Sequence, residues 1–363
     1  MRRPPVPGLM KMLGIDKPIF GFSHSIEVTA AISRAGGLGV MGVARESPDE
    51  IARTAARLEA LLGDKPYGLD LMFPSLSGDA RTVDEARARL PAEHVRFVEQ
   101  LTAAHDVPPA TRPHFFTHTV RTPGLFREQL AAVLGSRAGL IACGTGVTSD
   151  GITQIRQAGK LAIALIGSPR HAQRACDAGV DALVAQGCDA GGHTGPIGTF
   201  TLVPQIIEIA GGRPVLAAGG IGHGSQIAAS LAMGAQGAWL GTAWLTTHEH
   251  ALPDSLVRQL LAAQSTDTEI SRSHSGKPCR LLKGGWTEAW DREGSPKPLP
   301  MPYQQALTGP LVAAIEEHQV AALMYTPAGQ GVVWSRQLES VADVIDRLQA
   351  QMLSALAGLD SLH

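Results

Sequence analysis

The chain has 363 residues, of which 44% are hydrophobic, 18% charged and 4% aromatic, and 31 Lys and Arg against 33 Asp and Glu give a net charge of −2. This length suffices for one large α/β barrel or for two ordinary domains with a sizeable buried core. A nearly neutral chain without a run of Lys or Arg argues against a nucleic-acid or anionic-membrane partner, because such binding depends on neutralising many phosphates.

The N-terminal segment does not resemble a signal peptide. MRRPPVPGLM contains three prolines, and no apolar stretch of sufficient length follows it. No run of about 18 consecutive apolar residues occurs anywhere, so no membrane span is expected. The four cysteines form no C-x-x-C pair, which indicates reduced thiols in a cytoplasmic protein rather than a disulfide frame or a metal site: Cys143, Cys176, Cys188 and Cys279.

Short apolar segments alternate with longer helical patterns along most of the chain. Eight strands are predicted, over residues 18–22, 38–42, 67–73, 140–144, 161–167, 182–187, 214–220 and 237–242. Between them, apolar residues recur every three to four positions over 25–35, 48–62, 148–158, 169–178, 201–210 and 224–233. Uninterrupted apolar strands are typical of a parallel sheet covered by helices, and this number of βα units predicts a (β/α)8 TIM barrel. A doubly wound sheet is the alternative.

Two segments are additional to the βα units that a minimal barrel needs. Residues 74–137 are polar and charged, with a helical pattern over 83–104, and we interpret them as an elaboration of the third and fourth βα units. Past residue 246 the strand rhythm stops and a mostly helical pattern follows, interrupted by a loop over 271–302. We therefore expect a barrel over residues 1–246, elaborated at about 74–137. A mostly helical segment over 247–363 would cap the barrel mouth, the end where the strands' carboxyl termini lie.

Glycines close the last two predicted strands, with AAGGIG at 217–222 and LGT at 240–242. In such barrels the loops after strands seven and eight commonly hold a phosphate, because glycines let main-chain N–H groups approach an anion. Neither run is a Walker or G-x-G-x-x-G fingerprint, so a nucleoside triphosphate or Rossmann-type dinucleotide site is not supported. A phosphate site is the favoured interpretation, and tight strand-to-helix turns alone are the alternative.

The segment QGCDAGGHTG, residues 186–195, directly follows the sixth predicted strand. It places His193 on the catalytic face of the barrel, among glycines that let a flat ligand come close. An imidazole, with an ordinary pKa of about 6.5, suits proton transfer near neutrality. A loop histidine is often only a hydrogen-bonded surface residue, but these surroundings favour a functional role for His193.

These segments resemble the nitronate monooxygenase family, formerly called 2-nitropropane dioxygenases, which are FMN-dependent barrels akin to the FMN-containing enoyl reductases. The resemblance rests on residues 33–42, 182–195, 214–245 and 271–280, and extends over about 18–280. It implies an FMN-binding barrel in which His193 is the catalytic residue. It also implies that the FMN phosphate lies on Gly219, Gly220, Gly241 and Thr242, and that Gln186, Gly191 and Gly192 line the cofactor.

Two places depart from the family pattern. Many members begin with P-I-x-x-A-P-M, whereas here FGFSH follows Pro18-Ile19, so that Phe22 alters a flavin contact and His24 adds a second imidazole, a candidate substrate residue. Where members have G-V-N-L-F, this chain has GLDLM, which puts Asp70 in place of an amide near the flavin. A carboxylate only accepts hydrogen bonds, whereas an amide also donates them. The alternative role for Asp70 is a helix cap or a buried partner of a nearby Arg or Lys.

Several other side chains are candidates without a decided role. Three cations could hold an anionic substrate or lie on a solvated loop, namely Arg272, Lys277 and Arg280. Four histidines could reach the site, depending on how their loops fold: His114, His118, His223 and His274.

The activity predicted from these features is FMN-dependent oxidation of alkyl nitronates or nitroalkanes by O2 to carbonyl compounds and nitrite. His193 would take the proton beside the nitro group or hold the nitronate anion. A second hypothesis is an NAD(P)H-dependent flavin reductase that acts on an enoyl or acyl-CoA-like compound. The third is a non-catalytic barrel that binds a phosphorylated ligand. The sequence leaves open the physiological substrate, the use of NAD(P)H and the oligomeric state.

Overall fold

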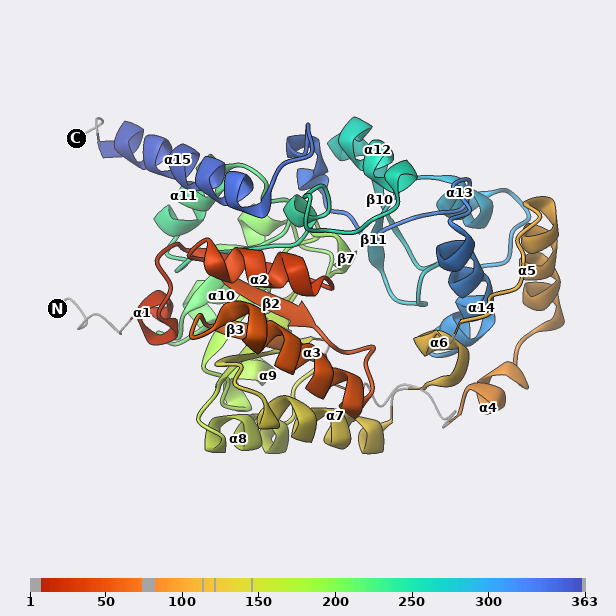
Figure 1. Ribbon diagram of the computed structural model, residues 1–363, viewed down its shortest axis with the longest axis horizontal. Helices are drawn as coiled ribbons and strands as arrows, with labels where there is room; N and C mark the ends of the chain where they lie inside the picture. Colours follow the sequence, from red (N-terminus) through yellow and green to blue (C-terminus); the bar gives the residue numbers. More distant parts are fainter. Residues whose placement is uncertain (1–7, 74–81, 113, 121, 145, 361–363) are drawn as a thin grey trace.

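The computed structural model describes residues 8–73, 82–112, 114–120, 122–144 and 146–360. Eight parallel strands close into a barrel in the order β1-β2-β3-β4-β5-β6-β8-β9 (Figure 1). Their bounds are Ile19–Ser23, Leu38–Gly42, Tyr67–Met72, Leu140–Gly144, Leu161–Ile166, Ala182–Gln186, Val215–Ala218 and Ala238–Leu240. All eight predicted strands are present, so the predicted TIM barrel is confirmed.

A ring of helices covers the outer face of the barrel. Six of these helices occupy predicted positions: α2 (Ile26–Arg34), α3 (Pro48–Leu62), α8 (Ser149–Gln157), α9 (Pro169–Asp177), α10 (Thr199–Ile209) and α11 (Gly224–Ala232). Helix α7 (Pro123–Gly135) packs against α3, and α15 (Val341–Asp360) packs against α11 and α2. Side-chain oxygens at the N-caps accept main-chain N–H groups and so set where several helices begin: Ser25, Ser47, Thr122, Thr148 and Ser168.

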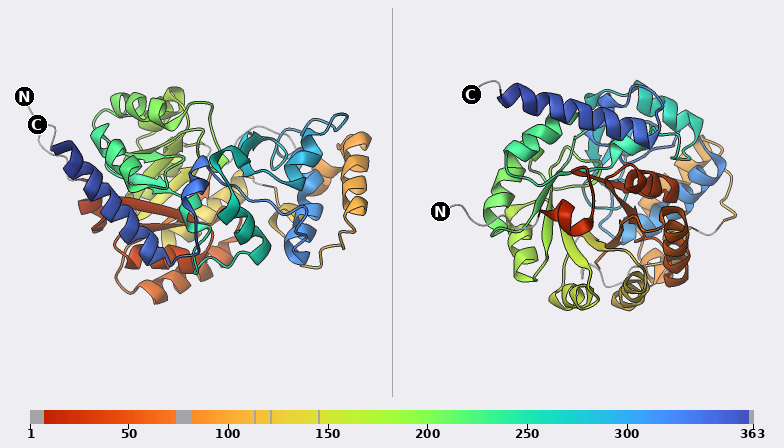
Figure 2. Two further views of the ribbon diagram at one scale, coloured as in Figure 1. Left: turned by 90° about the horizontal axis from the view of Figure 1, so that it is seen from above. Right: turned by 60° about the vertical axis from the view of Figure 1, so that its left-hand side comes forward.

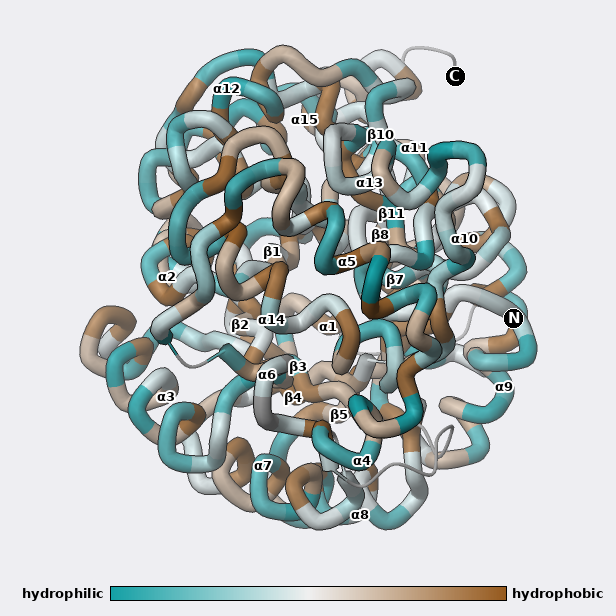
Figure 3. The backbone as a smooth tube through the Cα atoms, turned by 90° about the vertical axis from the view of Figure 1, so that its right-hand side faces the viewer, coloured by the Kyte–Doolittle hydropathy of each residue, from teal (hydrophilic) through white to brown (hydrophobic). Residues whose placement is uncertain are grey.

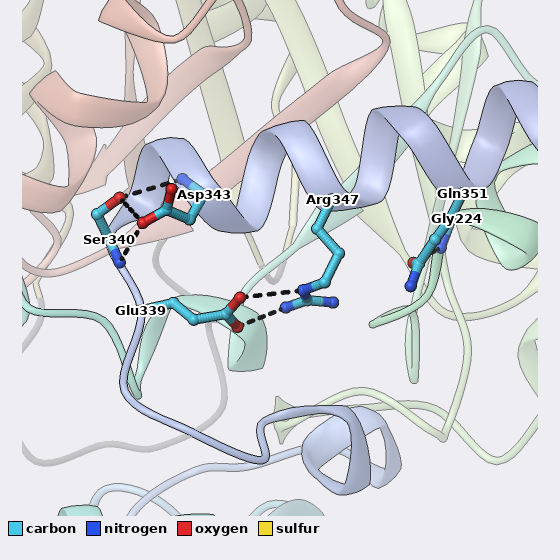
Figure 4. Close-up of polar contacts among 6 residues, drawn as sticks. All are labelled: Gly224, Glu339, Ser340, Asp343, Arg347 and Gln351. Carbon is cyan, nitrogen blue, oxygen red and sulfur yellow. Dashed lines mark hydrogen bonds and ion pairs between the residues drawn. The ribbon is translucent and has the colours of Figure 1, made fainter.

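The expected boundary at residue 246 does not separate the barrel from the rest of the chain, because α15 belongs to the barrel's helical ring. Arg347 of α15 forms a two-pronged ion pair with Glu339, with distances of 2.9 and 3.2 Å (Figure 4). The Gln351 side chain accepts the main-chain N–H of Gly224 at the start of α11, at 2.9 Å.

The segment expected to elaborate the barrel at 74–137 is not a single unit, because α7, its last helix, belongs to the helical ring of the barrel. The pattern over 83–104 forms two helices, α4 (Val83–Arg87) and α5 (Ala92–Ala104), because Pro91 begins a new helix as the N-cap of α5. Helices α4, α5 and α6 (Phe115–His118) pack against α14 (Tyr303–His318) rather than against the barrel. Residues 74–81 lie outside the described part of the chain.

A short helix that the sequence analysis missed closes the amino end of the barrel. The helix α1 (Leu9–Leu13) lies across this end of the barrel (Figure 2, right). Leu9, Leu13 and Ile15 join the apolar cluster inside the barrel. The helices α4, α5, α6 and α14 lie at the opposite end (Figure 1). Seen from that end, α6 and α14 lie in front of the strands (Figure 3).

The segment after residue 246 is less helical than expected. It contributes β10 (Thr268–Ser271) and β11 (Cys279–Leu282) to an antiparallel sheet with β7 (Gly192–His193), in the order β10-β11-β7. Its remaining elements are α12 (Asp254–Ala262), α13 (Gly285–Asp291), α14, α15 and two 3₁₀ turns, η2 (Ser265–Asp267) and η3 (Gln330–Trp334). No helix in the described part of the chain is both long enough and apolar enough to cross a membrane.

The alternation of side chains along each strand decides which residues face the barrel interior. Phe20, Val40, Ala142 and Val184 belong to the interior cluster, whereas Leu69 belongs to the layer between strands and helices. At the carboxyl ends of the strands the same alternation directs Phe22, Gly42, Asp70, Gly144 and Gln186 inward. These residues therefore form the floor of the barrel mouth.

Candidate functional site

His193 lies in β7, where it pairs with Cys279 of β11. Its Nε2 atom is 2.6 Å from the Ser275 hydroxyl oxygen, and the Gln186 side-chain amide donates to the His193 carbonyl at 2.8 Å. The end of β6 and a loop of the C-terminal segment thus hold His193 from two sides. A hydroxyl at one ring nitrogen fixes the orientation of an imidazole, as proton transfer requires.

Packing and hydrogen bonds keep the Ser275 loop in place. Gly276 has φ +84°, and a Cβ there would lie 2.2 Å from the carbonyl oxygen of Leu299, so the turn requires glycine. The buried Ser273 hydroxyl accepts the Trp286 indole N–H at 3.0 Å, and the Ser273 carbonyl accepts the Gln304 amide at 2.8 Å. This loop belongs to the 271–280 segment noted in the sequence, but Ser275 itself was not among the predicted site residues.

An aromatic cluster of the C-terminal segment adjoins His193. The His274 ring centroid lies 6.0 Å from that of His193, and His274 Nδ1 is 2.9 Å from the Tyr325 hydroxyl. Tyr325 stacks on Trp286 with ring centroids 4.9 Å apart. Burial raises the pKa of Tyr325, so its hydroxyl stays protonated at neutral pH. The sequence carried no signal for Tyr325, which lies 50 residues beyond Ser275.

His24 and Phe22 lie together on the β1 side of the mouth, with ring centroids 5.1 Å apart. His24 Nδ1 is 3.0 Å from the Gly42 carbonyl, which can only accept, so Nδ1 carries the proton and Nε2 is left as an acceptor. His24 is exposed at the rim of the mouth, yet its imidazole lies close to many protein atoms. This desolvation, and secondly the Arg45 guanidinium, lower its pKa to about 4. His24 is therefore a neutral acceptor at pH 7.

Asp70 lies between two residues that have no polar side chain. Its register partners on the neighbouring strands are Gly42 and Ala142. Its Oδ1 atom is buried and has no hydrogen-bond partner among the described residues. Burial raises the Asp70 pKa to about 8. In the described part of the chain, neither alternative role, a helix cap or a buried partner of a cation, is supported for Asp70.

The glycines after β8 and β9 form a main-chain cradle. Gly219 has φ +111° and Gly220 has φ +66°, and a Cβ on them would lie 2.5 Å from Thr199 Oγ1 and 2.9 Å from Asp189 Cβ, respectively. Gly241 has no atom within 4 Å of its Cβ position. Gly219 and Gly220 directly follow β8, and Gly241 directly follows β9, so all three lie at the carboxyl end of the barrel. The left-handed backbone of Gly219 and Gly220 and the uncovered Gly241 leave main chain without side chains at this rim, which fits the approach of an anionic phosphate.

The C-terminal segment closes against other predicted cofactor residues. The Thr242 hydroxyl accepts the Gly329 N–H at 2.9 Å, and a Cβ on Gly191 would lie 2.7 Å from the Gly329 nitrogen. Gly192, with φ +82°, pairs with Arg280 through β7 and β11. Gly191 and Thr242 thus hold the C-terminal segment against the cradle.

Other candidates have structural partners. Arg280 is buried, and its guanidinium donates to the Cys188 carbonyl at 2.8 Å and to Thr268 Oγ1 at 3.1 Å, so neither suggested role, anion binding or a solvated loop, applies to it. His223 caps α11 through Ser225, with Nδ1 2.8 Å from its hydroxyl, and His114 pairs with Glu316 at 3.3 Å. The His118 side chain lies outside the described part of the structure.

A family model described as nitronate monooxygenase matches residues 9–351 of this chain. A protein of Mycobacterium tuberculosis named as a monooxygenase is 40% identical over 305 residues, which are 82% of this chain and 81% of that protein. A nitronate monooxygenase of Paraburkholderia phytofirmans is 31% identical over 371 residues, which are 97% of this chain and 96% of the relative.

Among solved structures, a nitroalkane oxidase from Streptomyces ansochromogenes superposes with a TM-score of 0.81 at 26% identity, over 96% of this chain and 99% of that one. The family match covers the barrel and nearly all of the C-terminal segment. The chain therefore belongs to the nitronate monooxygenase family, whose members are oxidoreductases that in general depend on a flavin.

Proposed function

We propose that this protein binds FMN and oxidises alkyl nitronates with O2 to carbonyl compounds and nitrite. The observation that carries the proposal is the position of His193, held by Ser275 and Gln186 at the same barrel end as the glycine cradle. Its relatives named as nitronate monooxygenase and nitroalkane oxidase support this class of substrate.

The cradle residues would hold the cofactor by its phosphate. The main chain of Gly219, Gly220 and Gly241 would face the phosphate, and Phe22, Asp70 and Gln186 would contribute side chains on the floor of the mouth. The bound flavin would supply the electron transfer and the reaction with O2, which are the cofactor's own chemistry.

The protein would supply proton control and orientation. His193 takes the proton from the carbon beside the nitro group, or donates a hydrogen bond to a nitronate that is already anionic. The Ser275 hydroxyl holds the imidazole in place during this step. His24, neutral at pH 7, offers an acceptor on the β1 side of the mouth and would contact the substrate. General acid–base catalysis of this kind contributes about 10²–10⁴ in rate.

The test is O2 uptake and nitrite release from propionate 3-nitronate and from an alkyl nitronate, measured with flavin-loaded protein. His193→Ala should lower the rate about 10²-fold or more while FMN remains bound, because it removes the hydrogen-bond donor that would hold the nitronate anion. His171→Ala, an exposed histidine on α9, is the matched control and should keep the full rate. If flavin-loaded protein turns over no nitronate, or if His193→Ala keeps the wild-type rate, the proposed function is wrong.

A further inference from the structure

We propose that Asp70 presents a hydrogen-bond donor to the cofactor in the barrel mouth, in the way a side-chain amide at this position would. This inference rests on the flavin site proposed above. It concerns a position where this chain carries an acid in place of the amide of the family pattern.

The geometry leaves Asp70 facing the mouth, with one carboxyl oxygen that no described residue pairs. The side chain points into the barrel from the end of β3, flanked by Gly42 on β2 and Ala142 on β4, neither of which has a polar side chain. Its Oδ1 atom is buried and accepts no hydrogen bond from the described residues. Leaving a buried polar atom unpaired costs about 1–3 kcal/mol, so a partner from a bound ligand would be favourable.

The groups around Asp70 do not stabilise a negative charge on it. From β4, the Cys143 thiol is buried, and its pKa is raised, so it remains neutral. From the β1 side, the His24 ring lies against Gly42 and is neutral at pH 7. Arg45, which follows β2, acts on His24, and burial alone accounts for the raised pKa of Asp70. At pH 7 the carboxyl therefore keeps its proton.

A protonated carboxyl has the donor and acceptor pattern of an amide. It carries one O–H donor beside a carbonyl acceptor, whereas a carboxylate has acceptors only. Asp70 can therefore make the hydrogen bonds of an amide at neutral pH. It loses its donor as the pH rises through its pKa of about 8.

The first test is the affinity of the full-length protein for added FMN between pH 7 and pH 9, measured by quenching of flavin fluorescence. In wild type the Kd should rise about tenfold over this range, because ionisation removes the donor. Asp70→Asn keeps a donor that does not titrate, so its Kd for FMN should change less than about twofold between pH 7 and pH 9. Asp70→Ala should bind FMN about tenfold more weakly than wild type at pH 7.

Glu46→Gln is the matched control. Burial also raises the Glu46 pKa, but this carboxyl, in the connection between β2 and α3, lies against Thr54 of α3, so the variant should keep the wild-type pH profile. The same pH profile in wild type and Asp70→Asn would overturn the proposal. Binding of FMN by Asp70→Ala as tightly as by wild type at pH 7 would also overturn the proposal.

A second measurement, thermal unfolding without FMN, separates this proposal from the flavin assignment. The folded-state pKa of Asp70 lies above its unfolded value, so between about pH 4 and pH 8 the folded state binds the extra proton and wild type loses stability as the pH rises. The Tm of Asp70→Asn minus that of wild type should therefore increase from pH 4 to pH 8 and then level off. A constant difference would overturn the inference even if FMN binds. Failure to bind FMN together with the expected Tm trend would overturn the flavin assignment and leave only the protonated state of Asp70.

Discussion

The contact between Ser275 and His193 joins residues 82 positions apart in the sequence, one on a barrel loop and one on the C-terminal segment. At 2.6 Å it is a short hydrogen bond, and Ser275 sits in a loop that glycine geometry and buried hydrogen bonds keep rigid. The orientation of the proposed catalytic imidazole therefore depends on a segment outside the eight-stranded barrel.

Replacing Ser275 by alanine tests this dependence. The variant should lower kcat about fivefold, since the net value of such a hydrogen bond is about 1 kcal/mol, and should leave KM nearly unchanged. The pH profile of kcat should shift as well, because the hydroxyl contacts the imidazole proposed to hold or move the proton. Ser136→Ala, whose hydroxyl donates to Val133 at the end of α7, is the control. Unaltered kcat and pH profile in Ser275→Ala would rule out a positioning role.

The sequence predicted those site residues that end or directly follow a strand. His193, Phe22, His24 and Asp70 are of this kind, because parallel strands bring all their carboxyl ends to one face. Ser275, His274 and Tyr325 could not be placed in the same way. They come from loops whose position depends on tertiary packing of the C-terminal segment, and no local periodicity encodes that packing.

At the scale of elements, the barrel strands were predictable because each is an apolar run buried on both faces. The sheet β10-β11-β7 was missed because its strands have two to four residues, too few to show a period. The role of α15 was missed for another reason. About 100 residues separate it from β9, so chain order gave no indication that it returns to the barrel.

Helix α15 should contribute substantially to barrel stability, because its buried face fills the space against α11 and α2. Ile345 is fully buried, and Ile345→Ala should lower the free energy of unfolding by about 2–5 kcal/mol. Leu353, 53% exposed on the same helix, is the control, and Leu353→Ala should change stability by about 0.5 kcal/mol or less. Chemical denaturation measures both. Equal effects would show that α15 does not belong to the barrel core.

At the scale of the whole molecule, a closed barrel supplies the rigid floor and the C-terminal segment supplies part of the site. Gly329 contacts the cradle through Thr242 and Gly191, while Ser275 and His274 adjoin His193. The same segment also provides α15 on the outside of the barrel. The barrel and the C-terminal segment are therefore expected to fold together rather than as independent domains.

The central claim is that a flavin in the barrel mouth accepts electrons from a nitronate beside His193. The most direct measurement is the flavin absorbance of the full-length, FMN-loaded protein, recorded without oxygen after mixing with an alkyl nitronate and, separately, with NADPH. The expected result is loss of the oxidised flavin band with the nitronate and a stable band with NADPH. Rapid bleaching by NADPH with no response to the nitronate would contradict the claim and identify a reductase.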